Sequence, residues 1–91
     1  MYEVIVTNSF ARYYKLCLKR KYDIGLLNNL IETLDQSGTV PQKNLPHILS
    51  GKLIGCCWEC HVKADWLLIW IKDDKLKTIT LIGTGTHSDL F

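Results

Sequence analysis

Three histidines, His47, His61 and His87, are the residues of this 91-residue chain best suited to proton transfer near neutral pH. Imidazole has an unperturbed pKa close to neutrality, so it can both accept and donate a proton there. His47 lies in a segment containing both prolines, His61 ends a stretch with strand character, and His87 lies in a polar C-terminal stretch. Each could instead be an isolated surface histidine. Their shared position near strand ends and loops favours a common site.

Two carboxylates accompany His61. Glu59 lies two residues before it, so both side chains would face the same side of a sheet, and Asp65 follows at the next turn. A carboxylate beside an imidazole orients the ring and favours its protonated form. The alternative is a solvent-facing cross-strand pair and an aspartate that caps a turn. Lys52 and Lys63 flank this region and could contact phosphates, or could be exposed lysines that protect a sheet edge.

The pattern Cys57-x-x-Cys60-His61 matches the short signature of c-type haem attachment. The surrounding residues have strand character, however, and strand alternation places Cys57 and Cys60 on opposite faces. Two thiols on opposite faces cannot hold one haem edge or one metal ion. We therefore expect no metal and no cofactor, and cysteines that serve as small apolar residues. A redox or metal-binding module is the alternative that the pattern suggests.

The apolar spacing predicts a strand, two helices, a loop and three further strands. The first strand is expected at 2–7, the first helix over 10–22 with Asn8 or Ser9 as its cap, and the second helix from Asp23 to a stop at 37–38. A loop over 38–52 follows, and then strands at Leu53–Lys63, Trp66–Lys72 and Leu76–Gly83. WLLIWI at 66–71 is apolar on both faces, as in a central, twice-covered strand. This order predicts an α+β fold with the helices on one face of a mostly antiparallel sheet.

The composition predicts one ordered domain over residues 1–91. Hydrophobic residues make up 47% of the chain and the net charge is only +2, which argues against disorder. No basic, apolar leader is visible and the longest apolar run is too short to cross a bilayer, so we expect a cytoplasmic protein with no membrane contact. Arg12, Lys15, Lys19, Arg20 and Lys21 form a basic cluster, which is either a solvated helix face or a phosphate-contacting face. The glycines at 83 and 85 do not form a phosphate-binding loop signature.

Two motifs give the chain a resemblance to a known family. They are ECHVKADWLLI at 59–69 and TGTHSDLF at 84–91, with the His47 loop and its following glycines, Gly51 and Gly55, preceding them. The chain resembles, over essentially its full length, the YafQ branch of the RelE-like toxins. These are the mRNA-cleaving halves of bacterial type II toxin–antitoxin pairs, and the resemblance implies the RelE-like version of the α+β fold.

The resemblance also implies an activity. Relatives of this kind cut mRNA in the ribosomal A site without a metal, by attack of the 2′-OH on the adjacent phosphate, with imidazoles as base and acid. By position, it implies a direct proton-transfer role for His87, a shared second role for His47 and His61, and orientation of these rings by Asp65 and Glu59.

Other implied contacts concern binding. Phe91 would stack on an RNA base, as aromatic side chains do with unstacked RNA. Lys52 and Lys63 would contact phosphates. The implied partners are a cognate antitoxin, which would cover the basic helices or the active face, the ribosome with its mRNA, and operator DNA through the antitoxin complex alone.

One position departs from the family pattern. Many relatives carry an arginine just before the Thr-Gly-Thr-His run, where it steadies the transition-state phosphate, and this chain has Gly83. Loss of such an electrostatic contact can cost on the order of a hundredfold in rate. Lys52 or Lys63 could replace it, although a lysine lacks the planar fork of arginine. The alternative function is therefore a catalytically weak member that binds its antitoxin, and operator DNA through that complex, without cutting RNA.

Overall fold

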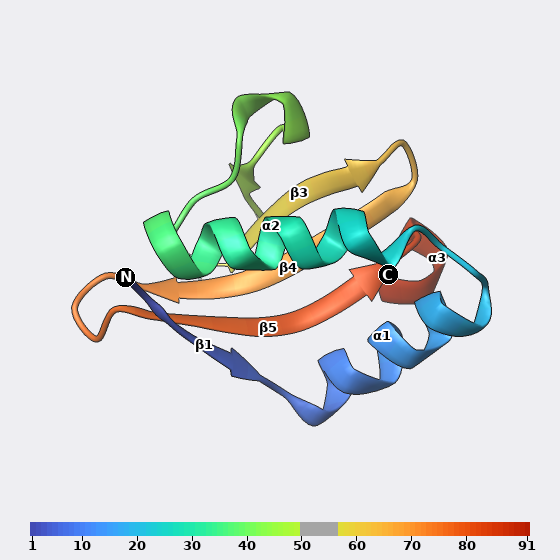
Figure 1. The fold of residues 1–91 in the computed structure, drawn as a ribbon, viewed down its shortest axis with the longest axis horizontal. Helices are drawn as coiled ribbons and strands as arrows, with labels where there is room; N and C mark the ends of the chain where they lie inside the picture. Colours follow the sequence, from blue (N-terminus) through green and yellow to red (C-terminus); the bar gives the residue numbers. More distant parts are fainter. Residues whose placement is uncertain (50–56) are drawn as a thin grey trace.

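Helices and strands of this protein were assigned in a computed structural model, which describes residues 1–49 and 57–91. They follow one another as β1 (Glu3–Val6), α1 (Asn8–Lys19), α2 (Ile24–Ser37), the short 3-10 helix η1 (Gln42–Asn44), β2 (His47–Ile48), β3 (Cys57–Lys63), β4 (Trp66–Asp73), β5 (Thr78–Gly85) and α3 (His87–Leu90). Within these ranges the strands form one sheet in the order β1-β5-β4-β3-β2, and α2 crosses in front of it (Figure 1). The predicted α+β fold, with a strand and a helical hairpin before the remaining strands, is confirmed.

The sheet is antiparallel except at one edge. β1 runs parallel to β5, with Glu3 opposite Thr78, whereas β2–β3, β3–β4 and β4–β5 are antiparallel neighbours. The two-residue β2 lies within the segment predicted as a loop, so four described strands follow the helices rather than three. The mostly antiparallel character of the prediction is confirmed.

Helices α1 and α2 cover one face of the sheet, and the core lies between the two layers. Because apolar residues recur at helical spacing, each helix offers one stripe to the sheet. The buried side chains of this layer include Phe10 and Cys17 from α1, Leu27, Leu30 and Leu34 from α2, and Cys60, Leu68, Trp70, Ile79 and Leu81 from the strands.

The start of α1 differs from the prediction. The N-cap is Thr7 and not Asn8 or Ser9: its Oγ1 accepts from the Phe10 N–H at 3.1 Å and donates to the Leu81 carbonyl at 2.8 Å. The second bond explains the choice, because Thr7 caps the helix and fastens it to β5 together. The helix also ends earlier than expected, at Lys19.

Helix α2 begins and ends where the sequence predicts. Asp23 occupies its N-cap position, although the side chain makes no capping hydrogen bond. Gly38 ends the helix with a φ of 74°, a left-handed conformation that glycine adopts readily.

The last strand is shifted by two residues from its predicted bounds, Leu76–Gly83. Asp73 accepts hydrogen bonds from the N–H groups of Lys75 and Leu76, which holds those residues in a turn. β5 therefore starts at Thr78, and it continues to Gly85 because residues 84 and 85 still pair with β4. The part of the Leu53–Lys63 prediction before Cys57 lies outside the described residues, and the rest forms β3.

Strand β3 alternates between the two faces as predicted. Cys60 and Val62 belong to the core under the helices, whereas Cys57, Glu59 and His61 point to the opposite face, which we call the far face. The thiols of Cys57 and Cys60 therefore do not converge. β4 is the central strand, and its residues from Trp66 to Trp70 are buried on both faces.

Candidate active site

The candidate residues are arranged in two adjacent rows across the far face. In one row His47, Glu59, Ile69 and Gly83 are successive partners on β2, β3, β4 and β5. In the next row His61, Leu67 and Gly85 are partners on β3, β4 and β5. Residues two apart along a strand are separated by roughly 6.6 Å, so these rows lie side by side. The pairing thus places His47, Glu59 and His61 on the same face, with His87 just beyond the end of β5.

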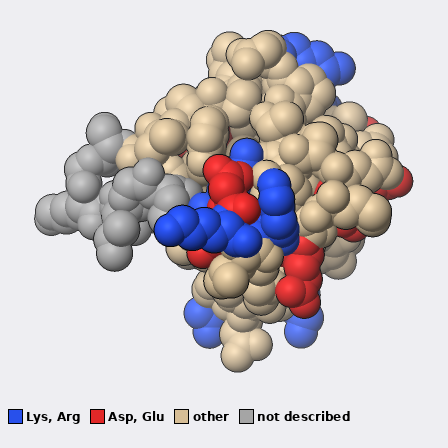
Figure 2. Space-filling view, turned by 90° about the vertical axis from the view of Figure 1, so that its left-hand side faces the viewer, with Lys and Arg blue, Asp and Glu red and all other residues tan. Residues whose placement is uncertain are grey.

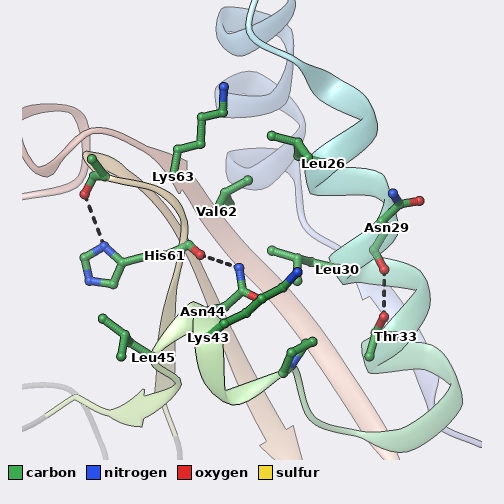
Figure 3. A pocket seen from close by; sticks show the side chains of 12 residues that line it. Leu26, Asn29, Leu30, Thr33, Lys43, Asn44, Leu45, His61, Val62 and Lys63 are labelled. Carbon is green, nitrogen blue, oxygen red and sulfur yellow. Dashed lines mark hydrogen bonds between the residues drawn. The ribbon is translucent and has the colours of Figure 1, made fainter.

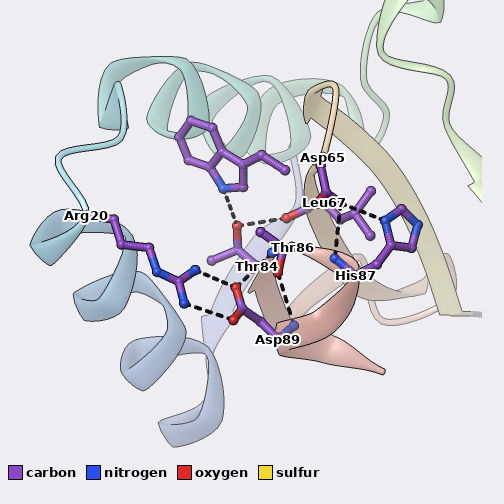
Figure 4. A network of polar contacts seen from close by, with 8 residues as sticks. Arg20, Asp65, Leu67, Thr84, Thr86, His87 and Asp89 are labelled. Atoms are coloured by element: carbon purple, nitrogen blue, oxygen red, sulfur yellow. Dashed lines mark hydrogen bonds and ion pairs between the residues drawn. The ribbon is translucent and has the colours of Figure 1, made fainter.

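His87 is joined to Asp65 through both its ring and its backbone (Figure 4). Nδ1 of His87 lies 2.8 Å from Oδ1 of Asp65, and the backbone N–H of His87 donates to the same oxygen at 3.2 Å. These bonds hold the pKa of the Asp65 carboxyl below its ordinary value. An ionised Asp65 accepts the Nδ1 proton of His87, so the neutral ring presents Nε2 as a proton acceptor.

His47 and Glu59 form the second pair. Nε2 of His47 lies 3.1 Å from Oε1 of Glu59, and Nδ1 lies 3.0 Å from the carbonyl of Leu45. Both ring nitrogens of His47 therefore face oxygen acceptors. The solvent-facing alternative for Glu59 is wrong, because its residue surface is only 6% exposed. Its partner is His47 on the neighbouring strand, whereas the sequence pointed first to His61.

His61 differs from the other two histidines because no carboxylate binds it among the described residues. Its Nδ1 lies 3.2 Å from the carbonyl of Ala64, which leaves Nε2 available (Figure 3). The backbone carbonyl of His61 accepts from Asn44 Nδ2 at 2.7 Å, and this bond ties η1 to β3. His61 lines one side of a groove of about 710 Å³ between α2, η1 and the end of β3, where Leu26 and Leu30 face the strand.

A second hollow, of about 680 Å³, adjoins the His87–Asp65 pair. Lys21 and Lys63 both line it, together with Asp65, Trp66 and Thr86. Lys63 is therefore beside the predicted site, and Lys21 joins it from the end of the first helix. Lys52, the other predicted phosphate contact, lies outside the described residues, as do Gly51 and Gly55.

Both threonines of the TGTH motif have a structural role. Thr84 accepts from Trp66 Nε1 at 2.9 Å and donates to the Leu67 carbonyl at 2.8 Å. Thr86 caps α3 through a reciprocal capping box with Asp89. The motif thereby connects the strand that precedes His87 to the strand that follows Asp65.

Arg20 and Asp89 form an ion pair next to the site, and the sequence did not predict this contact. The guanidinium donates to both carboxylate oxygens of Asp89, at 2.6 and 3.0 Å. The spacing Thr86-x-x-Asp89 is a readable capping signal, so a short helix could have been predicted within the polar C-terminal stretch. The Arg20 contact spans 69 residues of sequence and had no local signal.

Phe91 lies beside His87, as the motif suggests. The ring centroids are 6.3 Å apart with an interplanar angle of 38°, and Phe91 is 67% exposed. An exposed ring next to the candidate base has room to receive a nucleobase.

Gly83 occupies the row of His47 and Glu59, and Leu90 fills the space beside it. A Cβ at this position would lie 2.8 Å from Leu90 Cδ2. An arginine here would require the Leu90 side chain to turn away, which its flexible δ-methyl end permits. The departure from the family pattern is thus accompanied by a leucine packed against the glycine.

Charges of both signs meet on the end of the molecule that carries the N-terminus and the β4–β5 turn (Figure 2). Lys72 and Asp74 lie 3.7 Å apart there, and Tyr2 donates to Asp74 at 2.9 Å. This end is therefore not a uniformly basic surface. In residues 1–49 and 57–91, no helix has the length and apolar character needed to cross a membrane. Nor do three His, Cys, Asp or Glu side chains of these ranges gather in a group suited to a metal ion.

Solved structures with the same arrangement define the class of protein. The chain is similar to YafQ in the crystal structure of the Escherichia coli DinJ–YafQ complex, at 28% identity and a TM-score of 0.89, with coverage of 100% of this chain and 99% of that one. It is equally similar to a metal-bound toxin from Helicobacter pylori, at 30% identity and a TM-score of 0.89, with both chains fully covered. The fold is that of a RelE-like toxin.

Sequence comparisons identify the family within this class. A curated relative, the mRNA interferase toxin YafQ of E. coli strain B / BL21-DE3, is 32% identical over 93 residues, which cover 98% of this chain and 95% of that protein. The family model described as "Bacterial toxin of type II toxin-antitoxin system, YafQ" matches residues 2–91. The chain belongs to the YafQ family of type II toxin–antitoxin toxins.

Proposed function

We propose that this protein is a ribosome-dependent mRNA endoribonuclease that acts in the cytoplasm without a metal ion. The observation that carries the proposal is the His87–Asp65 pair, which orients one imidazole with Nε2 available at an exposed position. Its membership of a family whose curated relatives are mRNA interferases supports the same activity.

In the proposed reaction, the ribose 2′-OH attacks the adjacent phosphorus and the bond to the 5′-oxygen of the next nucleotide breaks. Nε2 of His87 takes the 2′-OH proton, and a second imidazole gives a proton to the departing 5′-oxygen. The products are a 2′,3′-cyclic phosphate and a 5′-hydroxyl. Asp65 keeps the proton on Nδ1 of His87 and stabilises the ring when it becomes positively charged.

The second imidazole comes from His61 or His47. Nε2 of His61 has no partner in the described part of the chain, whereas both nitrogens of His47 already face acceptors. This difference favours His61 as the acid. The His47–Glu59 pair then supports the charge that develops on the phosphate, with Glu59 orienting the His47 ring.

RNA binding is assigned to the residues around this pair. Phe91 would stack on a base next to the cleaved bond, because the ring is exposed and lies beside His87. Lys63 and Lys21 border the hollow next to Asp65 and would contact backbone phosphates. Lys52 remains a further predicted phosphate contact.

The proposed partner that silences the toxin is a cognate antitoxin. E. coli YafQ is solved in complex with DinJ, and this chain covers all but 1% of that toxin chain. For this protein we expect an antitoxin that covers the basic helices or the far face, and a complex that binds operator DNA through the antitoxin.

The test is cleavage by purified protein on programmed ribosomes. Primer extension on the mRNA should show new 5′ ends with the natural protein, and His87→Ala should abolish them while circular dichroism stays unchanged. Naked mRNA serves as the control for ribosome dependence. Intact mRNA with the natural protein, or equal cutting by His87→Ala, would refute the proposal.

A second candidate function rests on Gly83. Glycine supplies no guanidinium at the position where many relatives carry arginine, and Leu90 fills the space next to it. Such a protein would bind its antitoxin without cutting RNA. The discriminating variant is Gly83→Arg with Leu90→Ala, which provides space for the longer side chain. Cutting gained by this variant alone, above an inactive natural protein, supports the binding-only function.

A further inference from the structure

We propose that Arg20, just after the end of α1, is a positioning residue for His87 and Phe91, and that it acts by holding α3 through Asp89. The inference rests on the proposed function for the catalytic role of His87. Arg20 itself lies outside the two motifs at 59–69 and 84–91 and belongs to the basic cluster near the N-terminus.

The four-residue α3 needs such support. Helix formation is unfavourable until several turns are made, so a segment of one turn is held by tertiary contacts rather than by its own hydrogen bonds. His87 begins this turn and Phe91 follows it. Any freedom of α3 is therefore freedom of both side chains.

Asp89 is the residue through which α3 is attached to the helix layer. Its Oδ2 accepts from Arg20 at 2.6 Å and from the Thr86 N–H at 2.9 Å, and its Oδ1 accepts from Arg20 at 3.0 Å. This two-pronged contact uses the planar fork of arginine, which a lysine cannot reproduce. One carboxylate therefore joins α1 to the first turn of α3 (Figure 4).

Gly85 makes room for this carboxylate. A Cβ at residue 85 would lie 2.6 Å from Asp89 Oδ2 and 3.1 Å from Asp89 Cβ. Its φ of 142° is also one that other residues rarely adopt. The glycine of the TGTH motif thus fits the place where Asp89 meets Arg20.

The guanidinium of Arg20 is already bound within the protein, unlike that of a side chain exposed for RNA binding. Both of its terminal nitrogens donate to Asp89, and its Cζ lies 6.0 Å from the centre of the Tyr22 ring. Arg20 in turn keeps the pKa of the Asp89 carboxyl far below its ordinary value, so the pair stays charged at neutral pH. These contacts favour a role in holding α3 over direct contact with a phosphate.

The first test uses the free protein and does not depend on cleavage. Amide exchange and backbone order parameters of residues 86–91 are compared by NMR in the natural protein, Arg20→Ala and Lys19→Ala. Lys19→Ala removes one positive charge from the same helix end without removing the Asp89 contact. Arg20→Ala should speed exchange in α3 about fivefold or more and broaden the His87 ring signals. Unchanged exchange and ring signals in Arg20→Ala would overturn the inference.

The second test measures single-turnover cleavage on ribosomes. Arg20→Ala should lower the rate constant at saturating ribosomes roughly fivefold, because His87 is then held less often in its productive position. Arg20→Lys should recover part of the loss. Asp89→Asn, which keeps an acceptor for the Thr86 N–H, should resemble Arg20→Ala, and the double variant should be no worse than the poorer single one.

Multiplying losses in the double variant would mean that Arg20 acts independently of Asp89, as in a direct contact with RNA, and would overturn the inference. Failure of the natural protein to cut RNA would refute the proposed function instead. In that case the exchange measurements still decide whether Arg20 holds α3 and His87 in place.

Discussion

Thr84→Val removes a buried hydroxyl while keeping the shape of the side chain. Thr84 is 1% exposed, and its hydroxyl accepts from Trp66 Nε1 and donates to the Leu67 carbonyl. Valine offers neither bond, so the buried indole N–H loses its acceptor. A buried donor left without a partner costs about 1–3 kcal/mol, and we expect a loss near 2 kcal/mol in the free energy of unfolding.

Thr84→Ser is the matched control. Serine keeps the hydroxyl and removes one methyl group, which costs about 1 kcal/mol for the lost apolar burial and the small cavity. For a domain of this size each kcal/mol lowers the melting temperature by about 4–8 °C. Thr84→Val should therefore melt about 8–16 °C below the natural protein, and Thr84→Ser about half as far below it.

The assay is thermal and urea unfolding followed by circular dichroism. The reasoning fails if Thr84→Val is as stable as the natural protein or more stable than Thr84→Ser. Either result would mean that packing, and not the hydrogen bonds, gives Thr84 its importance. Because Trp66 directly follows Asp65, and His87 lies three residues after Thr84, we also expect Thr84→Val to loosen the His87–Asp65 pair.

Three further predictions concern charge, backbone strain and thiols. His87 lowers the pKa of Asp65, so the pair stabilises the fold above the ordinary carboxyl pKa and loses this contribution as the pH falls through the lowered value. The urea midpoint should therefore fall less steeply at acidic pH in Asp65→Asn than in the natural protein. Parallel plots of urea midpoint against pH for the two proteins would contradict this. Lys21, just after the end of α1, has a φ of 60°, so Lys21→Gly should raise the free energy of unfolding by roughly 0.5–1 kcal/mol. The same variant should weaken cleavage, because it removes a proposed phosphate contact. A lower free energy of unfolding, measured with urea, would show that the conformation carries no strain. Burial raises the pKa of Cys60 to about 12 and also raises that of Cys17. Iodoacetamide should therefore alkylate both thiols only after unfolding, as read by peptide mass spectrometry. Rapid labelling of either thiol in the native protein would disprove this prediction.

Patterns that depend on neighbouring residues were predictable from the sequence. The two helices follow from their apolar spacing, and the opposite orientations of Cys57 and Cys60 follow from strand alternation. The turn that carries Asp65 lies where predicted, between β3 and β4. These features need no knowledge of distant contacts.

Contacts between distant segments were not predictable in the same way. The burial of Glu59 depends on β2, whose His47 is its cross-strand partner, and a two-residue strand leaves almost no sequence signal. The choice of Thr7 as the α1 cap depends on the Leu81 carbonyl, 74 residues away. The motifs show which residues belong to the candidate site. Which side chains bind one another could be known only from the register of the sheet.

The parallel pairing of β1 with β5 has a consequence for the order of events during synthesis. Glu3–Val6 are synthesised first, yet their partners are residues 78–81. Strand β1 can therefore pair with the sheet only after β5 has been synthesised. Long-range pairing of this kind is formed late, because the intervening chain must first be closed into a loop. His47 and His61 on the sheet, and His87 beside it, thus come together only after most of the described chain has been translated. The proposed proton-transfer groups therefore meet only in a nearly finished chain, which separates synthesis from the proposed activity.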